Sequence, residues 1–260
     1  MRLKDKIAVI TGGTSGMGRA AAELFAKEGA KVVVAARRKR LGEYVAESIR
    51  NGGGTAIFVK ADVSEKHQVM DLIDEASDTF GGLNILFNNA GINNHGDGDP
   101  HNEDLENFDQ VMNVNLKGAF LCIRYAVPRM IESNGGSIIN NSSVLDLRAT
   151  ETSSTSYHVS KGGMSMLTKK AALSYAKHNI RVNSIQPGAI ATEMSNVSWD
   201  DLETESVIEH RRKFQPLDKM GHPIDVAYAA LYFASDESAF VTGASLLVDG
   251  GSSASFGRNR

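Results

Sequence analysis

Short runs rich in β-branched and apolar residues alternate along the chain with longer stretches in which apolar residues recur every three or four positions. Runs of the first kind predict buried strands, and stretches of the second kind predict amphipathic helices. Strands are predicted at residues 7–11, 31–36, 55–60, 84–88, 136–141, 180–186 and 245–248. Helices are predicted near residues 17–28, 39–51, 65–79, 105–132, 156–178 and 223–234. This alternation is typical of βαβ units, so the pattern predicts a parallel sheet with helices on both faces.

The predicted elements follow one another without a linker, a repeat or a low-complexity tract. We therefore expect a single doubly wound, Rossmann-like α/β domain over residues 1–260, with a substrate lid near 189–215. Hydrophobic residues make up 42% of the chain, which is enough for a substantial core. The net charge of −3 gives no basic field, so neither nucleic acid nor a membrane is expected as a partner.

The cysteine and histidine residues limit the disulfides and metal sites that the chain can form. Cys122 is the single cysteine, which excludes an intrachain disulfide and a thiolate-rich metal site. The apolar run 7–10 is too short for a signal peptide, and no run approaches the ~20 apolar residues of a membrane helix. A cytoplasmic location follows as the expectation. His95, His101 and His158 do not form a metal cluster in the sequence, so no catalytic metal is expected.

Glycines and small polar residues follow the predicted strands at the sheet edge where ligands bind in open parallel sheets. The first strand runs into Gly16-x-Gly18-x-x-Ala21, directly before a helix. Glycine lets the backbone approach a phosphate, and the helix N-terminus offers free N–H groups. The alternative is a tight structural turn. The pattern predicts a pyrophosphate site with contacts from Gly12, Thr14, Ser15, Gly16, Met17 and Gly18.

The residues after the second strand bear on the choice of cofactor. Ala36 stands where Asp or Glu would bind a free ribose 2′-hydroxyl, and Arg37, Arg38, Lys39 and Arg40 follow it. Cations at a helix start oppose the helix dipole, and a 2′-phosphate would relieve that cost. NADP(H) is therefore favoured over NAD(H), with Arg37 as the better-placed contact and Arg38 as the second. The alternative is a solvated basic turn.

The third strand is followed by Asp62 and Val63. Asp62 is expected to accept a hydrogen bond from the adenine amino group, while Val63 packs alongside. Asp62 also stands, together with Ser64, where residues cap the next helix, and both roles are compatible.

Tyr157 and Lys161 lie four residues apart, on one face of a predicted helix. A nearby ammonium stabilises a phenolate and lowers the pKa of the phenol toward the working range of an acid/base catalyst. Ser143 follows the fifth strand and is positioned to hydrogen-bond a substrate oxygen, although the adjacent Ser142 is an alternative. Asn115 interrupts an apolar helical stretch, either bonding backbone at a kink or holding a water that links Lys161 to solvent.

Together these residues resemble the short-chain dehydrogenase/reductase family over nearly the whole chain. The resemblance is carried in order by Thr11-Gly12-x-x-x-Gly16-x-Gly18, Asn88-Asn89-Ala90-Gly91, Asn115, Ser143, Tyr157-x-x-x-Lys161 and Pro187-Gly188-x-x-x-Thr192. It implies that Tyr157 is the acid/base, that Lys161 lowers its pKa and holds the nicotinamide ribose, and that Ser143 orients the carbonyl. Asn115 would complete a proton relay.

The same resemblance assigns the remaining cofactor contacts. Pro187, Gly188, Ile190 and Thr192 would seat the nicotinamide carboxamide. Asn89, Ala90 and Gly91 would line the adenosine side, while Asn88 braces the sheet. The chain departs from the family pattern by one extra residue between Ser143 and Tyr157, and by Leu145-Asp146 where a small residue or glycine is usual. These departures are expected to reshape the substrate side.

The sequence therefore predicts an NADP(H)-dependent oxidoreductase that interconverts a small-molecule carbonyl compound and an alcohol. Polar loops at 93–104 and 144–156 favour a polar substrate, with Arg148 as a candidate anion contact; the alternative is that these loops are polar because they are solvated. The alternatives are a sugar 1-dehydrogenase, a 3-oxoacyl-carrier-protein reductase, and a nucleotide-sensing regulatory protein without catalysis. The helices predicted at 105–132 and 156–178 have more apolar residues than one face of the sheet can cover. Together with the family resemblance, this excess predicts a homotetramer.

Overall fold

Seven parallel strands form one sheet in the computed structural model, which describes residues 1–93, 98–151, 153–195 and 215–255. The strands are β1 Ile7–Thr11, β2 Lys31–Ala36, β3 Thr55–Lys60, β4 Ile85–Asn88, β5 Gly136–Asn141, β6 Ile180–Pro187 and β7 Ser245–Val248. Their order is β3-β2-β1-β4-β5-β6-β7. The chain reverses its direction of winding between β1 and β4, and ligands bind at such a switch point in doubly wound sheets. The predicted fold class is confirmed.

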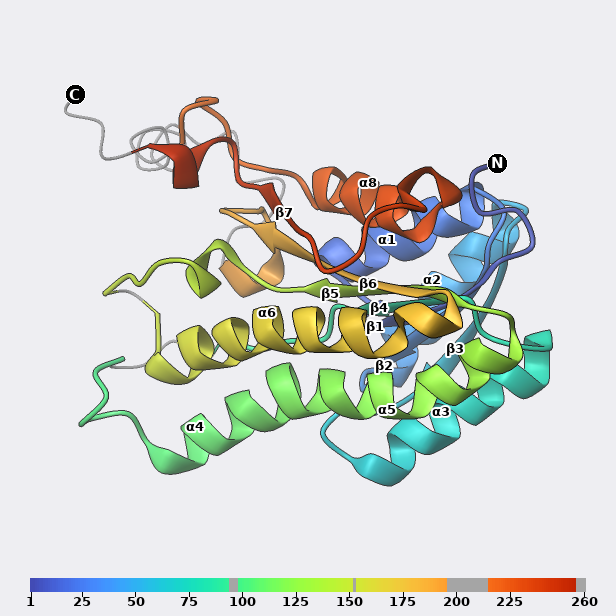
Figure 1. The fold of residues 1–260 in the computed structure, drawn as a ribbon, viewed down its shortest axis with the longest axis horizontal. Coiled ribbons are helices and arrows are strands. Elements are labelled where there is room, and N and C mark those ends of the chain that lie inside the picture. Colours follow the sequence, from blue (N-terminus) through green and yellow to red (C-terminus); the bar gives the residue numbers. More distant parts are fainter. Residues whose placement is uncertain (94–97, 152, 196–214, 256–260) are drawn as a thin grey trace.

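Helices cover both faces of the sheet (Figure 1). One face carries α1 Gly16–Lys27, α2 Lys39–Asn51 and α8 Pro223–Ala234. The other carries α3 Lys66–Phe80, α5 Gly118–Glu132 and α6 Thr155–Tyr175, with α4 Leu105–Met112 extending from α5. None of the described helices combines the length and the apolar character needed to cross a membrane.

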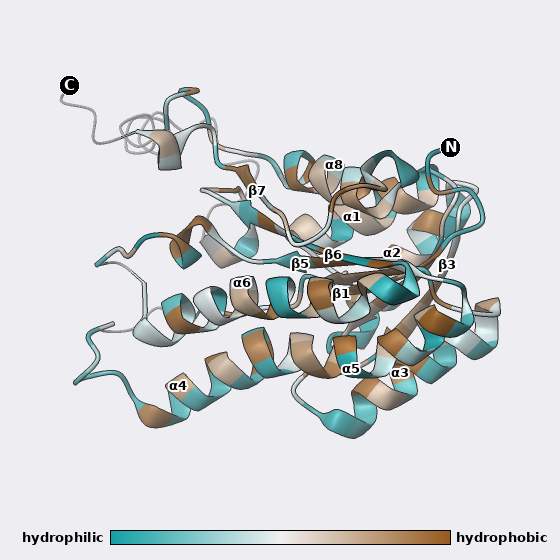
Figure 2. Cartoon of the chain, viewed as in Figure 1, coloured by the Kyte–Doolittle hydropathy of each residue, from teal (hydrophilic) through white to brown (hydrophobic). Residues whose placement is uncertain are grey.

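Successive residues of the central strands supply two separate cores. Ala8 and Ile10 of β1 pack with α1, α2 and α8, whereas Ile7 and Val9 pack with α3, α5 and α6. Burial on both faces explains why these strands are continuous apolar runs. Figure 2 shows brown strands around β1, with helices of mixed brown and teal on both sides of the sheet.

The helix predicted near 105–132 is interrupted. α4 ends at Met112, a π-helical turn spans Asn113–Lys117, and α5 begins at Gly118. The side chain of Asn115 lies inside this turn and bonds both backbone groups of Ile92, donating at 2.9 Å and accepting at 2.8 Å. Such single-turn bulges commonly occur at functional sites.

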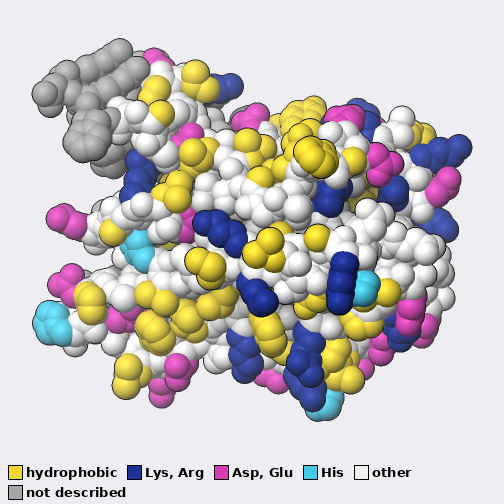
Figure 3. Space-filling model, in the orientation of Figure 1, with side chains coloured by type: hydrophobic (Ala, Val, Ile, Leu, Met, Phe, Trp, Pro, Cys, Tyr) yellow, Lys and Arg dark blue, Asp and Glu magenta, His cyan; other side chains and the backbone are white. Residues whose placement is uncertain are grey.

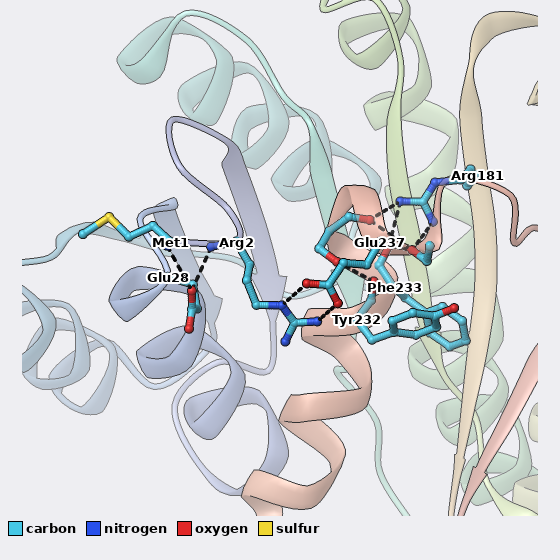
Figure 4. A network of polar contacts seen from close by, with 9 residues as sticks. Met1, Arg2, Glu28, Arg181, Tyr232, Phe233 and Glu237 are labelled. Carbon is cyan, nitrogen blue, oxygen red and sulfur yellow. Dashed lines mark hydrogen bonds and ion pairs between the residues drawn. The ribbon is translucent and has the colours of Figure 1, made fainter.

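Polar contacts join the N-terminal residues and the start of β6 to their neighbours, including the residues that follow α8 (Figure 4). The guanidinium of Arg181, at the start of β6, donates to the carbonyls of Phe233 and Ser235 at 2.9 and 3.1 Å. Arg2 donates to both carboxylate oxygens of Glu237. Burial lowers the pKa of Arg181. The two bonds from Arg181 satisfy backbone carbonyls at and just after the end of α8, where a helix has no partners of its own for them.

Two glycines inside helices should respond in opposite ways to the same substitution. A Cβ at Gly42 in α2 would lie 2.0 Å from the ring of Phe58, whereas one at Gly162 in α6 meets none of the described atoms within 4 Å. Gly42→Ala should lower the free energy of unfolding by about 1–3 kcal/mol through overpacking. Gly162→Ala should raise it by about 0.5–1 kcal/mol, because alanine favours helix. Urea unfolding measures both, and changes of the same sign would contradict this packing.

Candidate active site

A cavity of about 340 Å³ opens at the carboxyl ends of β1 to β4. It is lined by residues 12, 14–17, 35–38, 61–63, 89–92, 114 and 192–194. Most of the predicted cofactor contacts therefore come together around one space. Gly18, Tyr157, Lys161, Pro187, Gly188 and Ile190 do not line it. They belong to α1, to α6, to the last residue of β6 and to the chain after it.

The glycines of the turn after β1 leave its backbone accessible to a ligand at close distance. Gly12 and Gly16 have φ angles of 65° and 50°, in the left-handed region that favours glycine. A Cβ at Gly18 would lie 2.3 Å from the carbonyl oxygen of Gly12 and 2.4 Å from Nδ2 of Asn89. The first turn of α1 follows directly, and its free N–H groups suit an anion. This cradle fits the pyrophosphate of a dinucleotide.

Asn89 holds the glycine turn against β4. Its Nδ2 donates to the carbonyl of Thr11 at 3.0 Å and to that of Gly12 at 3.3 Å. Its Oδ1 accepts from Nδ2 of Asn141 at 2.9 Å. The side chain of Asn89 is thus occupied within the protein, although the residue lines the cavity as predicted. Asn88 bonds Asn140 across the sheet at 2.9 Å, in keeping with its predicted bracing role.

Arg38, rather than Arg37, reaches the glycine turn. Nη2 of Arg38 donates to Oγ of Ser15 at 2.8 Å and to Oγ1 of Thr14 at 3.4 Å, and its Nη1 lies 3.2 Å from Glu193. Arg37 lies 3.8 Å from the carboxylate of Asp62. Two cations therefore border the end of the cavity where β2 and β3 finish.

Asp62 holds the loop before α3 but does not cap this helix, whose N-cap is Glu65 without a side-chain cap bond. Oδ1 of Asp62 accepts from the backbone N–H and the hydroxyl of Ser64 at 3.0 and 2.7 Å. The neighbouring Val63 packs against Gly118, where a Cβ would lie 2.8 Å from the valine side chain. Glycine at the start of α5 thus lets this helix approach the loop after β3.

Tyr157 lies in the first turn of α6, where Oγ of Ser154 accepts from the Tyr157 N–H at 3.3 Å. The ammonium of Lys161, one turn later, lies 5.5 Å from the centre of the Tyr157 ring. It donates to the carbonyl oxygen of Asn141 at 2.7 Å. A Cβ at Gly91 would lie 3.8 Å from this ammonium, so the Tyr157–Lys161 pair borders the cavity wall. The four-residue spacing puts Tyr157 and Lys161 on one side of α6, and the bond to Asn141 at the end of β5 holds Lys161 near the cavity.

Burial dominates the ionisation of this pair. It raises the pKa of Tyr157, while a hydrogen bond to Ser143 acts in the opposite direction and the charge of Asp146 raises it further. Burial also lowers the pKa of Lys161 to about 8, against the charge of Asp146. The expected lowering of the Tyr157 pKa by Lys161 is not found in this structure: burial is the largest influence on the phenol, and the Lys161 charge is not among the causes of its shift.

The two serines after β5 have different partners. The hydroxyl of Ser142 donates to the carboxylate of Asp146 at 2.6 Å and lies 3.2 Å from the carbonyl of Lys161. The hydroxyl of Ser143 accepts from the N–H of Leu145 at 3.1 Å and bonds Tyr157. Of the two, Ser143 is therefore the one that meets the phenol.

Asn115 lies fully buried behind the Tyr157–Lys161 pair. Besides its two bonds to Ile92, its Nδ2 lies 3.2 Å from the hydroxyl of Ser160, on the helix turn that carries both Tyr157 and Lys161. A Cβ at Gly91 would lie 3.4 Å from Oδ1 of Asn115. The kink-bonding role that the sequence allowed is present, and the water-relay role stays a prediction.

The chain after β6 crosses in front of the glycine turn. A Cβ at Gly188 would lie 2.8 Å from Cα of Asp249, so only glycine fits there, and Ile190 forms a β-bridge with Gly221. A Cβ at Gly16 would lie 3.1 Å from the methyl of Thr192. This path agrees with contacts to a bound dinucleotide. Of the predicted lid at 189–215, residues 196–214 lie outside the described residues, as do 94–97 of the first polar loop.

Arg148 is engaged within the protein. Its guanidinium donates to the carbonyl and the hydroxyl of Ser252 at 2.9 and 3.1 Å, which ties the 144–156 loop to the segment after β7. Asp249 binds the same segment through Ser252 and Ser253. These contacts account for Arg148 without the substrate anion that the sequence suggested.

The short network around Asp146 was not foreseen in the sequence. Its carboxylate accepts from Ser142, from Ser165 of α6 and from Gln186 of β6. The sequence showed only that Asp146 stands where the family usually has a small residue or glycine. That observation does not identify the side chains that bond its carboxylate. Among the described residues no group of three or more His, Cys, Asp and Glu has metal-binding geometry; His95 lies outside them.

Known proteins resemble the chain over almost its full length. A family model described as enoyl-(acyl carrier protein) reductase matches residues 12–253. The uncharacterized oxidoreductase YxbG of Bacillus subtilis is 42% identical, covering 96% of this chain and 92% of that protein. Glucose 1-dehydrogenase 2 of the same organism is 40% identical, covering 96% and 95%.

A solved structure agrees in fold as well as in sequence. A short-chain dehydrogenase/reductase from Burkholderia xenovorans superposes with a TM-score of 0.89 at 35% identity, covering 98% of each chain. The glycine turn, the Tyr157–Lys161 pair and these similarities lead to one conclusion. The chain belongs to the short-chain dehydrogenase/reductase family and is an NAD(P)-dependent oxidoreductase.

Proposed function

We propose that the protein is an NADP(H)-dependent oxidoreductase that interconverts a ketone or aldehyde and the corresponding alcohol. The observation that carries this proposal is the position of Ser143, Tyr157 and Lys161 beside the cavity that the glycine turn lines. A bound NADPH would supply the hydride. The protein must then hold the carbonyl oxygen and deliver a proton to it, and each of these tasks has a candidate group.

The catalytic roles follow from hydrogen bonding and burial. Tyr157 would give its proton to the oxygen of the substrate as negative charge develops there, and would take it back in the oxidation direction. Ser143 bonds the phenol and would hold the same oxygen. Lys161 would bind the nicotinamide ribose, and its charge would favour the phenolate left after proton transfer. Asn115 would carry the proton relay.

The two arginines support the preference for NADP(H). A 2′-phosphate in the cavity beyond Ala36 would lie between Arg38, which already bonds Ser15, and Arg37, which is near Asp62. Charge-assisted hydrogen bonds to a phosphate are about twice as strong as neutral ones. An NADH ribose offers these cations no anion, and Ala36 offers it no carboxylate.

A polar substrate is favoured, and a sugar 1-dehydrogenase is the second candidate. The described parts of the loops at 93–104 and 144–156 are rich in polar side chains. The 40% identical relative is named glucose 1-dehydrogenase 2, which supports a sugar as one arm of a substrate test. A sensor without catalysis would be expected to lack Asn115, Ser143, Tyr157 or Lys161, and the chain retains all four.

We also propose that the enzyme is a cytoplasmic homotetramer. Large apolar side chains are exposed on α5 and α6, including Phe120, Met166 and Leu173, which is 82% exposed. Figure 3 shows hydrophobic side chains gathered over the helices of this face. Phe240 and Leu247 are exposed near β7, far along the sheet from α5. Two separate apolar surfaces suit a tetramer with two kinds of interface.

Removing the phenol hydroxyl should stop turnover without emptying the cofactor site. Tyr157→Phe should reduce kcat for ketone reduction by about 10²–10⁴-fold, because the proton donor is lost. Oxidation of NADPH measured at 340 nm gives kcat, and NADPH fluorescence gives the cofactor Kd. The Kd should stay within about threefold of the wild-type value, a change well under 1.4 kcal/mol. Full activity in Tyr157→Phe would contradict the proposed mechanism.

Cofactor preference should depend on the arginines at the end of β2. Arg38→Ala should raise KM for NADPH by roughly 10–100-fold, since charged hydrogen bonds contribute about 1.5–3 kcal/mol. KM for NADH should change much less, and Arg37→Ala should act in the same direction. Lys39→Ala is the matched control, because Lys39 pairs with Glu43 on the exposed side of α2. Equal losses for both cofactors would argue against a 2′-phosphate contact.

The assembly should be visible in solution. Light scattering of the wild-type protein should give four times the mass of one chain. Leu173→Glu places a charge on the exposed apolar surface of α6 and should yield smaller species, with unchanged far-UV circular dichroism. A monomeric wild-type protein at micromolar concentration would rule out the tetramer.

A further inference from the structure

Asp146 occupies the position where the chain departs from its family pattern, and its carboxylate is enclosed by donors. Oγ of Ser142 donates to it at 2.6 Å, Oγ of Ser165 at 2.5 Å and Nε2 of Gln186 at 2.7 Å. These donors come from the end of β5, the middle of α6 and the end of β6. The carboxylate therefore links three elements that meet behind the Tyr157–Lys161 pair.

These bonds point the carboxylate into the protein. Each oxygen accepts at least one short hydrogen bond, and both serine hydroxyls are directed to the same oxygen, Oδ2. A carboxylate held in this way is an acceptor that its neighbours already use. Asp146 is therefore poorly suited to bind a substrate hydroxyl, and its position is explained by what it does to the neighbouring side chains.

The charge of Asp146 acts on both members of the pair. It favours the protonated form of Tyr157 and of Lys161. A carboxylate stabilises a nearby ammonium and disfavours a nearby phenolate, so both effects have the same sign. In a low-dielectric setting this interaction is much stronger than in water.

Other charged groups near α6 are engaged elsewhere. Glu103, which precedes α4, bonds the N–H and hydroxyl of Ser156 at the start of α6. His158 bridges Ser154 and Thr150 on the outer side of the first turn. Lys117 of the π-helical turn bonds Asn113 at an exposed position.

Charges on the sheet side of α6 are likewise occupied. Arg181 of β6 lies at the opposite strand end and bonds carbonyls after α8. After β5 and β7, Arg148 bonds Ser252, and Asp249 bonds backbone and hydroxyl groups of 251–253. Among these described groups, Asp146 is the carboxylate whose charge acts on both Tyr157 and Lys161.

We propose that Asp146 is a positioning residue of this oxidoreductase. Its carboxylate fixes the segment that carries Ser143 against the helix that carries Tyr157 and Lys161, and supplies the negative charge that both of these side chains face. The inference rests on the proposed acid/base role of Tyr157.

The negative charge of Asp146 determines in which direction it shifts the pH dependence of catalysis. Ketone reduction needs Tyr157 to hold a proton, and Asp146 extends the pH range in which it does. Alcohol oxidation needs Tyr157 to accept a proton, so Asp146 moves the onset of oxidation to higher pH. Removing the charge should lower the pKa of Tyr157 and shift the rising limb of the oxidation profile to lower pH.

The test is a direct titration of the phenol in the full-length protein. Tyrosines labelled with ¹³C at Cζ report ionisation by NMR, and Tyr157→Phe assigns the resonance of Tyr157. Asp146→Asn keeps the size of the side chain and removes its charge. It should lower the pKa of Tyr157 by roughly half a unit or more, because the negative charge that disfavours the phenolate is lost. The oxidation profile should shift in the same direction.

Ser165→Ala is the matched control, because it removes one hydrogen bond to Asp146 and leaves the charge in place. It should leave the Tyr157 pKa near its wild-type value. An unchanged Tyr157 titration in Asp146→Asn, or an equal shift in Ser165→Ala, would overturn the proposal. If Asp146→Asn does not fold, Asp146→Ala removes the same charge without introducing an amide. The titration needs no turnover, so an inactive wild-type protein would count against the proposed function and not against this role of Asp146.

Discussion

The bond between the buried ammonium of Lys161 and the carbonyl oxygen of Asn141 joins α6 to the end of β5 in the central sheet. It exists because β5 ends where α6 passes, and because the ammonium finds an acceptor there in place of water. Burial of an ammonium is costly unless hydrogen bonds replace its hydration. The bond therefore constrains the position of Lys161, and helical geometry then places Tyr157 on the same side of α6. The glycine turn after β1 and Gly91 after β4 bring the cofactor cavity to the same point.

The electrostatics of the site result from a balance between burial and charge. Burial alone pushes the phenol and the ammonium toward their neutral forms, whereas Asp146 favours the protonated form of each. For Lys161 the two influences oppose each other, and for Tyr157 they reinforce each other. Both influences thus favour the protonated phenol of Tyr157, which is the form that the proposed role of proton donor requires. The positive charge of Lys161 matters most once the phenol has lost its proton.

The sheet was largely predictable because each parallel strand is buried on both faces and is a short apolar run in the sequence. Predicted and observed bounds agree at β1, β2, β3, β5 and β7, and differ by one residue at β4 and β6. The gathering of glycines and polar residues at one rim was also predictable, since parallel strands bring their ends together. Contacts between residues that are far apart in the sequence were not predictable. The π-helical turn depends on a partner of Asn115 at Ile92, and the setting of Asp146 depends on Gln186, 40 residues away. The relative placement of Arg37 and Arg38 depends on side-chain conformation, which no sequence pattern specifies.

The central claim is that hydride passes between NADP(H) and a carbonyl carbon beside Tyr157. It is tested most directly with NADPH carrying deuterium at both positions of nicotinamide C4, incubated with the protein and a panel of ketones and keto sugars. Mass spectrometry of the product should find one deuterium on the carbinol carbon of the alcohol, in equal amount to the NADPH consumed. Oxidation of NADPH without deuterium in any alcohol product, or tight binding of NADPH with no reduction of any carbonyl compound, would contradict the account.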